Sequence, residues 1–237
     1  MGRSRVAFAL LLGAFVALYA AVAAPVPPAS QRDPTSPAAF FPTVVGTEWN
    51  YRVNYSYAPG GRADRAFDEV KVVTDVTAQD GERFVRVREV RGDSPYPVTE
   101  WSVSETGLRR RGVTRNGSGA WITALSKSVV RGETWTQEIM SDRSRSVKRV
   151  VGWEEINVPA GAYRAVRVDL VMTVHERGVT GPIRETITGT WWYAPGVGCV
   201  KQTVVGQHQR FEIVRELVSF KPGNGVVPPA KAPLRDD

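Results

Sequence analysis

The sequence predicts an all-β protein whose strands form a strongly curved antiparallel meander, a half-barrel or open barrel. Two observations predict this class. Most segments between residues 40 and 220 alternate apolar and polar side chains with a period of two, which is the pattern of a half-buried strand. Turn residues also recur between these segments at hairpin spacing, as at Asp80-Gly81 and Asn116-Gly117.

The first strand is expected over residues 49–57, where every second side chain is large and apolar. The side chains on this face are Trp49, Tyr51, Val53, Tyr55 and Tyr57. Strands over 70–76 and 84–90 are expected to be joined by a tight turn at Asp80-Gly81, with Gly81 at a positive φ. Pro59-Gly60-Gly61 is expected to turn the first strand into the second.

The later segments continue the same alternation. Further strands are expected over residues 98–104, 108–114, 135–140, 147–158, 163–175, 183–193, 199–205 and 211–220. Over 163–175, one face is wholly apolar and the other mixes aliphatic and charged groups, which favours a strongly bent sheet over a flat one. Residues 120–130 are the one stretch compatible with a short helix.

An internal repeat supports two related halves. The segment 44–49 (VVGTEW) resembles 129–135 (VVRGETW), and each is followed by strands and a glycine that precedes an aromatic-led strand. The match needs a one-residue shift, so duplication of half the sheet and chance similarity both remain open.

The N-terminal 23 residues predict a secretory signal peptide. A basic head at Arg3 and Arg5 precedes an uncharged apolar run over 6–20, and Ala21-Val22-Ala23 offers a small-x-small cleavage site. The run is too short to span a membrane, so no transmembrane anchor is expected after cleavage. The chain is therefore expected to be exported to the periplasm or the extracellular space, with a Pro-rich linker over 24–39, one domain over 40–220 and a disordered Pro-rich tail over 221–237.

The amino-acid composition limits the classes of molecule that the protein is expected to bind. Cleavage removes Arg3 and Arg5, so the formal net charge of +7 falls to +5, and the basic residues are scattered instead of forming a stripe with stacking aromatics. No nucleic-acid partner is expected, whereas lipid or an anionic envelope polymer could be attracted by the mild positive charge. The single cysteine, Cys199, excludes an internal disulfide and is interpreted as a small buried hydrophobe.

No catalytic constellation is visible in the sequence. The two histidines, His175 and His208, lack partners at metal-ligand spacing, and there is no G-x-S-x-G elbow. We therefore expect no catalytic residues, no metal site and no cofactor.

Three segments carry a resemblance to known proteins. They are FPTVVGTEWNY over 41–51, VPAGAY over 158–163 and WYAPGVGCVK over 192–201. Together they resemble a group of uncharacterised exported bacterial proteins with an F-P-x-x-x-G-x-x-W-x-Y opening and a Y-A-P-G-V-G-x-V-K closing motif. The layout is also loosely similar to the curved sheets of lipoprotein carriers of the LolA and LolB type, a resemblance of fold that assigns no activity.

The function predicted from these observations is that of an exported, non-enzymatic β-sheet protein that binds an apolar or amphiphilic envelope ligand. Aromatic side chains on the inner face are the candidate ligand contacts, namely Tyr51, Tyr55 and Trp192. The alternatives are that these rings only fill the core, that the protein is a hydrolase acting on envelope polymers, or that it is a structural or adhesion module.

Overall fold

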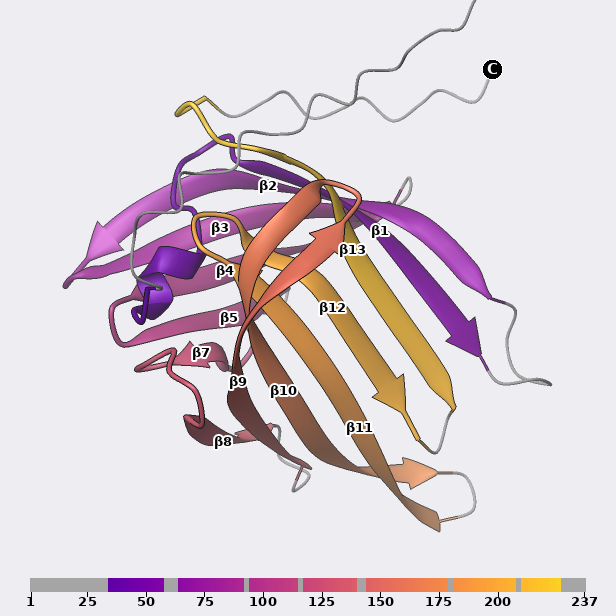
Figure 1. The fold of residues 1–237 in the computed structure, drawn as a ribbon. Helices are drawn as coiled ribbons and strands as arrows, with labels where there is room; N and C mark the ends of the chain where they lie inside the picture. Colours follow the sequence, from indigo (N-terminus) through magenta and orange to yellow (C-terminus); the bar gives the residue numbers. More distant parts are fainter. Residues whose placement is uncertain are drawn as a thin grey trace, which may run out of the picture.

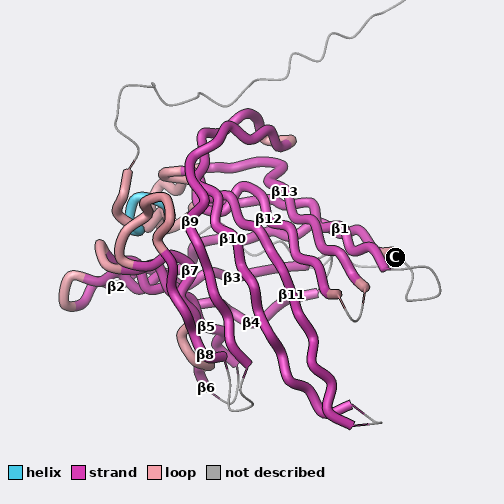
Figure 2. The backbone as a smooth tube through the Cα atoms, turned by 60° about the horizontal axis from the view of Figure 1, so that its bottom comes forward, coloured by secondary structure: helices cyan, strands magenta, loops and turns pink. Residues whose placement is uncertain are grey.

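The computed structural model describes residues 34–57, 64–91, 94–114, 117–139, 144–178, 181–207 and 210–226. Almost all of them belong to one antiparallel sheet that curls into a nearly closed barrel, as Figures 1 and 2 show from two directions. The predicted all-β, strongly curved meander is therefore confirmed.

The sheet follows the chain in two runs of strands. The first run is β1 (Glu48–Tyr57), β2 (Arg65–Gln79), β3 (Glu82–Arg91), β4 (Ser94–Ser104), β5 (Gly107–Thr114), the short β6 (Gly117–Ser118) and β7 (Ile122–Ser126). The second run is β8 (Thr134–Ile139), β9 (Ser144–Val158), β10 (Gly161–Gly178), β11 (Gly181–Ala194), β12 (Gly198–Gly206) and β13 (Phe211–Lys221). In the described residues each strand pairs with its chain neighbours except at β7, which pairs with β5 and not with β6 or β8, and the sheet closes where β1 pairs with β13.

Two local features of the chain were predicted from the sequence, a hairpin turn at residues 80–81 and a short helix over 120–130. The β2–β3 hairpin turns at Asp80 and Gly81, whose φ angles of 51° and 76° are those of a tight two-residue turn, so that prediction is confirmed. The helix considered over 120–130 is wrong, because the segment forms β7. Its pairing places Leu125 opposite Leu108 in the core, and this burial outweighs the local preference.

The repeated sequence corresponds to a repeated structure. In the first half, the Gly46 amide donates to the Val73 carbonyl and the Val73 amide donates to Thr47, both at 2.9 Å. In the second half, the Gly132 amide donates to the Val150 carbonyl and the Val150 amide donates to Glu133, again at 2.9 Å. Gly46 and Gly132 have φ of 83° and 91°. The pair β1–β2 is thus the structural counterpart of β8–β9.

The same equivalence explains the seam of the barrel. Since β13 closes onto β1, the counterpart closure would be β7 onto β8, but these two strands share no backbone ladder in the described residues. The side chain of Gln137 on β8 bridges them instead. Its amide oxygen accepts from the Thr123 amide at 2.8 Å, and its nitrogen donates to the Trp121 carbonyl at 2.5 Å. The carboxamide thus takes the place of a backbone peptide in joining the edges.

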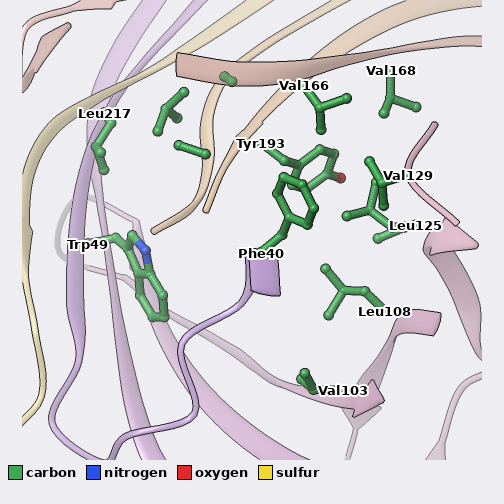
Figure 3. Packing of buried hydrophobic residues seen from close by; sticks show 14 of the residues in the cluster. Phe40, Trp49, Val103, Leu108, Leu125, Val129, Val166, Val168, Tyr193 and Leu217 are labelled. Carbon is green, nitrogen blue, oxygen red and sulfur yellow. The ribbon is translucent and has the colours of Figure 1, made fainter. Parts of the chain in front are cut away.

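A short segment before β1 fills one end of the barrel. The 3-10 turn η1 (Pro37–Phe40) carries Phe40 into the centre of the core, where it is fully buried among residues of both halves (Figure 3). Phe41 stacks on Trp101 with ring centroids 4.5 Å apart, and the Ala39 carbonyl accepts from the Gly196 amide at 2.7 Å. Residues 34–39, expected to belong to the linker, are therefore packed as part of the folded unit.

The two ends of the chain lie largely outside the described residues. The predicted signal peptide over 1–23, the linker up to residue 33 and the tail beyond residue 226 lie outside the described residues. Residues 222–226 continue from β13 onto the Gly46 turn, where the Gly225 amide donates to the Val45 carbonyl at 3.0 Å. None of the helical structure in the described residues is long and apolar enough to cross a membrane.

Candidate site on the inner face of the barrel

Strand register identifies the side chains that face the interior. Residues directly opposite each other in an antiparallel pair share a face, so the partners of buried core residues also point inward. At the η1 end, this inner face is filled by apolar side chains that are nearly inaccessible to solvent, including Trp49, Val53, Val85, Val87, Val103, Leu108, Val166, Val168 and Leu217. Figure 3 shows this cluster around Phe40.

Toward the far end of β1 the inner face changes character, because its apolar side chains are only half-buried. We call this set the apolar floor: Tyr55, Phe67, Met172, Ile187, Trp191, Val204, Phe211 and Ile213. It crosses six neighbouring strands, from β10 through β11, β12, β13 and β1 to β2, or about 24 Å at the usual strand spacing. Its surface remains partly open to solvent.

Two glycines in the sheet leave space for aromatic rings of the apolar floor. A side chain at Gly189 would overlap the ring of Trp191, and one at Gly206 would overlap the ring of Phe211. Both rings therefore lie down along the sheet over a neighbouring glycine instead of standing up into the interior. This leaves the inner face of β11, β12 and β13 as a broad aromatic and aliphatic surface.

The three residues proposed from sequence do not lie together. Tyr51 and Tyr55 both face inward, but Tyr51 is only 5% exposed and its hydroxyl donates to the Cys199 carbonyl at 2.8 Å. Tyr55 is half-buried and stacks on Phe67 with centroids 5.8 Å apart. Trp192 faces outward, where its indole N–H donates to the Glu154 carboxylate. Of the three, Tyr55 alone belongs to the apolar floor, and its role in binding stays a prediction.

Charged side chains also occupy the inner face. We call five of them the ion cluster: Glu69, Lys71, Glu89, Arg91 and Arg215. Glu69 is fully buried and pairs with Lys71, Arg91 and Arg215, each at 3.1 Å. Glu89 is 3% exposed and pairs with Lys71 at 3.2 Å and with Arg91 at 2.6 Å. Three cations thus surround two carboxylates in the interior.

This arrangement shifts the pKa values of Lys71 and Glu89. Burial lowers the pKa of Lys71, and Arg215 lowers it further, while the two carboxylates oppose the shift. For Glu89, burial works to raise the pKa, but Lys71 and Arg91 outweigh it and hold the value below its usual range. The neighbouring cations therefore favour the anionic form of Glu89 inside the fold.

Two further cations, Arg110 and Lys148, face the interior outside the ion cluster. Arg110 is opposite Trp101 on the inner face and remains exposed, and Lys148 is opposite the buried Leu170. Among the described side chains, no carboxylate forms an ion pair with either cation. The Lys148 ammonium donates to the Thr123 carbonyl across the seam. Burial, together with the nearby Arg110 charge, lowers the pKa of Lys148 to about 7.

The cysteine and the two histidines do not form a reactive site among the described residues. The Cys199 thiol donates to the Lys201 carbonyl at 3.2 Å, and burial raises its pKa to about 11, so it is not an activated nucleophile. His208 lies outside the described residues, and only the backbone is described at His175. The described residues contain no group of three metal-ligating side chains.

A hollow on the outside of the molecule is not the better site. It lies between the tips of the β2–β3 and β4–β5 hairpins and is lined by turn residues, among them Asp80, Gly81, Glu105 and Thr106. Its lining combines acidic and hydroxyl side chains with the ring of Phe84 and contains no basic side chain. The inner face, by contrast, combines open apolar surface with unpaired positive charge.

Comparison with known proteins shows a shared fold and assigns no activity. No protein-family model and no curated protein matches the sequence. Among solved structures, a predicted exported protein with a YmcC-like fold from Bacteroides fragilis matches at 15% identity, with a TM-score of 0.53 over 78% of this chain and 99% of that one. A predicted lipoprotein from Parabacteroides distasonis matches at 16% identity, with a TM-score of 0.54 over 80% of this chain and all of that one. The chain shares their fold.

Proposed function

We propose that this protein is exported to the bacterial envelope and there binds an apolar or amphiphilic ligand, without catalysis, on the inner face of its barrel. The observation that carries the proposal is the apolar floor. Side chains such as Trp191, Val204 and Ile213 face inward and yet stay partly open to solvent. Apolar surface left in contact with water in this way is a characteristic of ligand-binding faces.

Export is supported from two sides. The predicted signal peptide over 1–23 has the head, the apolar run and the cleavage pattern of a secreted chain. The two proteins of similar fold are named as an exported protein and a lipoprotein, and both come from bacteria. A ligand from the envelope, such as a lipid or a molecule with an acyl chain, would then be within reach.

The dimensions of the floor fit a long chain better than a compact molecule. The floor runs across six strands, about 24 Å, but it is only one or two side chains wide along each strand. A single extended acyl chain lying across the strands would cover these side chains in one row. The favourable binding free energy would come from apolar surface removed from water, at roughly 25 cal/mol per Å².

The test uses two matched pairs of substitutions on the same two strands. Val204 and Ile213 are register partners on the inner face, and their chain neighbours Val205 and Val214 face outward. We expect the wild-type protein to bind a fluorescent acyl probe saturably. The double variant V204S/I213S should weaken that binding about tenfold or more, whereas V205S/V214S should leave it unchanged.

Circular dichroism and thermal melting establish that both double variants retain the fold. Equal loss of binding in the two variants would place the ligand elsewhere. If unlabelled monolaurin and laurate both fail to displace the probe from the wild-type protein, the proposed function is wrong.

A further inference from the structure

The two halves of the barrel provide an internal comparison for the inner cations. Because β1–β2 is equivalent to β8–β9, Lys71 corresponds to Lys148 and Trp49 corresponds to Trp135. Lys71 lies opposite Trp49 in the first half, and Lys148 lies opposite Trp135 in the second. The two pairs occupy the same place in their half-sheets, so they differ only in what surrounds them.

In the first half, both polar groups are satisfied within the protein. The Lys71 ammonium lies 3.1 Å from a Glu69 oxygen and 3.2 Å from a Glu89 oxygen. The indole N–H of Trp49 donates to the Val197 carbonyl at 2.6 Å. Lys71 therefore has two carboxylates beside it, and the indole N–H of Trp49 has an internal acceptor.

In the second half, the matching acceptors are missing from the sequence. Strand register places Ser146 at the position of Glu69 and Leu170 at the position of Glu89. Lys148 therefore has no carboxylate beside it, and the buried indole N–H of Trp135 has no acceptor among the described residues. Since a buried donor without a partner costs stability, this arrangement calls for an acceptor from outside the chain.

A third donor lies at the same place. Arg110 pairs with Ile122 of β7, and the carbonyl of the next residue, Thr123, accepts from the Lys148 ammonium. Arg110 and Lys148 therefore lie on the two sides of the seam, beside the consecutive residues Ile122 and Thr123 of β7. A planar guanidinium next to an ammonium is suited to bind the two oxygens of a carboxylate.

We propose that Arg110, Lys148 and Trp135 bind the carboxylate head group of a fatty acid whose chain lies on the apolar floor. This inference rests on the proposed function, because the floor must hold the chain. Leu170, opposite Lys148, leads from the head-group site onto the floor at Met172 and Trp191. A carboxylate is the group assigned because carboxylates fill the equivalent site in the first half, where Glu69 and Glu89 neutralise Lys71.

The experiment compares two ligands with the same acyl chain and different head groups. Laurate is an anion and monolaurin is neutral, and each is used to displace the fluorescent probe from the full-length mature protein. We expect wild-type protein to prefer laurate at least tenfold. In the variants Lys148→Gln and Arg110→Gln, the preference for laurate should fall to about threefold or less.

The matched control is Arg149→Gln. Arg149 is the next residue on β9 and is exposed on the opposite face, so its loss changes the net charge equally without touching the inner face. The control should keep the wild-type preference. Equal displacement by laurate and monolaurin in the wild type would overturn the head-group site while leaving the proposed function standing. If dodecyl phosphate displaces the probe at a lower concentration than laurate does, the assignment of a carboxylate head group is wrong.

Discussion

Replacing Lys148 with glutamine should make the protein more stable at neutral and mildly acidic pH, although it removes a charged side chain with a hydrogen bond. The pKa of Lys148 is lowered from its ordinary 10.5 to about 7, first by burial and then by Arg110. A shift of this size corresponds to about 5 kcal/mol at 1.36 kcal/mol per pKa unit, as an upper bound. Lys148 keeps some contact with solvent, so we expect a gain of about 2 kcal/mol. The glutamine amide can still donate to Thr123.

The pH dependence identifies the cause. Below pH 7 the lysine is charged in both the folded and the unfolded state, so the cost of burying the charge is fully present. Between pH 7 and 10.5 the unfolded state binds a proton that the folded state does not, and the stability of the wild type rises with pH. The advantage of the K148Q variant should therefore be greatest near pH 6 and should shrink steadily by pH 9.

Urea unfolding followed by tryptophan fluorescence at pH 6, 7.5 and 9 measures this difference. The counterpart variant K71Q should have the opposite sign, because Lys71 neutralises two buried carboxylates, and its loss should cost about 3 kcal/mol. A K148Q variant that is less stable than wild type at pH 6, or a difference that does not change with pH, would refute the reasoning.

Three further predictions concern single positions. Gly81→Val should lower the unfolding free energy by about 1 kcal/mol or more, because Gly81 has φ of 76° and a β-branched residue resists that conformation, whereas Gly81→Asn should be tolerated better; chemical denaturation measures both. Gln137→Leu should cost about 1–3 kcal/mol, since it leaves the Thr123 amide and the Trp121 carbonyl without their partner, and hydrogen exchange at Thr123 should accelerate. Cys199 should react with a thiol reagent at pH 8 only after unfolding, because its pKa is about 11; rapid labelling of the native protein would contradict this.

Much of the fold was accessible from the sequence because strand alternation and turn chemistry are local properties. The alternation over 49–57 places Tyr51 and Tyr55 on one face, and the Asp80-Gly81 pair defines a hairpin in a two-residue window. The repeat between 44–49 and 129–135 was also visible, because the same turn requires glycine at the same place. These features do not depend on what packs against them.

The missed features depend on contacts between distant parts of the chain. Residues 34–39 have the Pro-rich composition of a linker, and only their packing between the two halves, next to Phe40, makes them part of the folded unit. Trp191, Trp192 and Tyr193 are consecutive aromatics, so alternation alone does not say which of them faces outward. The inner charges were missed for a related reason: Glu69 and Lys71 occupy inward positions of β2, where sequence reasoning expects apolar groups.

The site proposed here arises where the two halves differ. Both halves place a tryptophan and a lysine in the same positions of the same hydrogen-bonded frame, but only the first half supplies the acceptors that make this pair stable. In the second half the same pair lies at the seam, beside strands joined by side chains instead of a backbone ladder. The unpaired charge of Lys148 and the unpartnered indole N–H of Trp135 therefore both lie at the seam, where no backbone ladder joins β7 to β8 in the described residues. Natural proteins break such rules of internal consistency mainly at functional sites, and the anionic head group of a ligand on the apolar floor would supply the missing acceptor here.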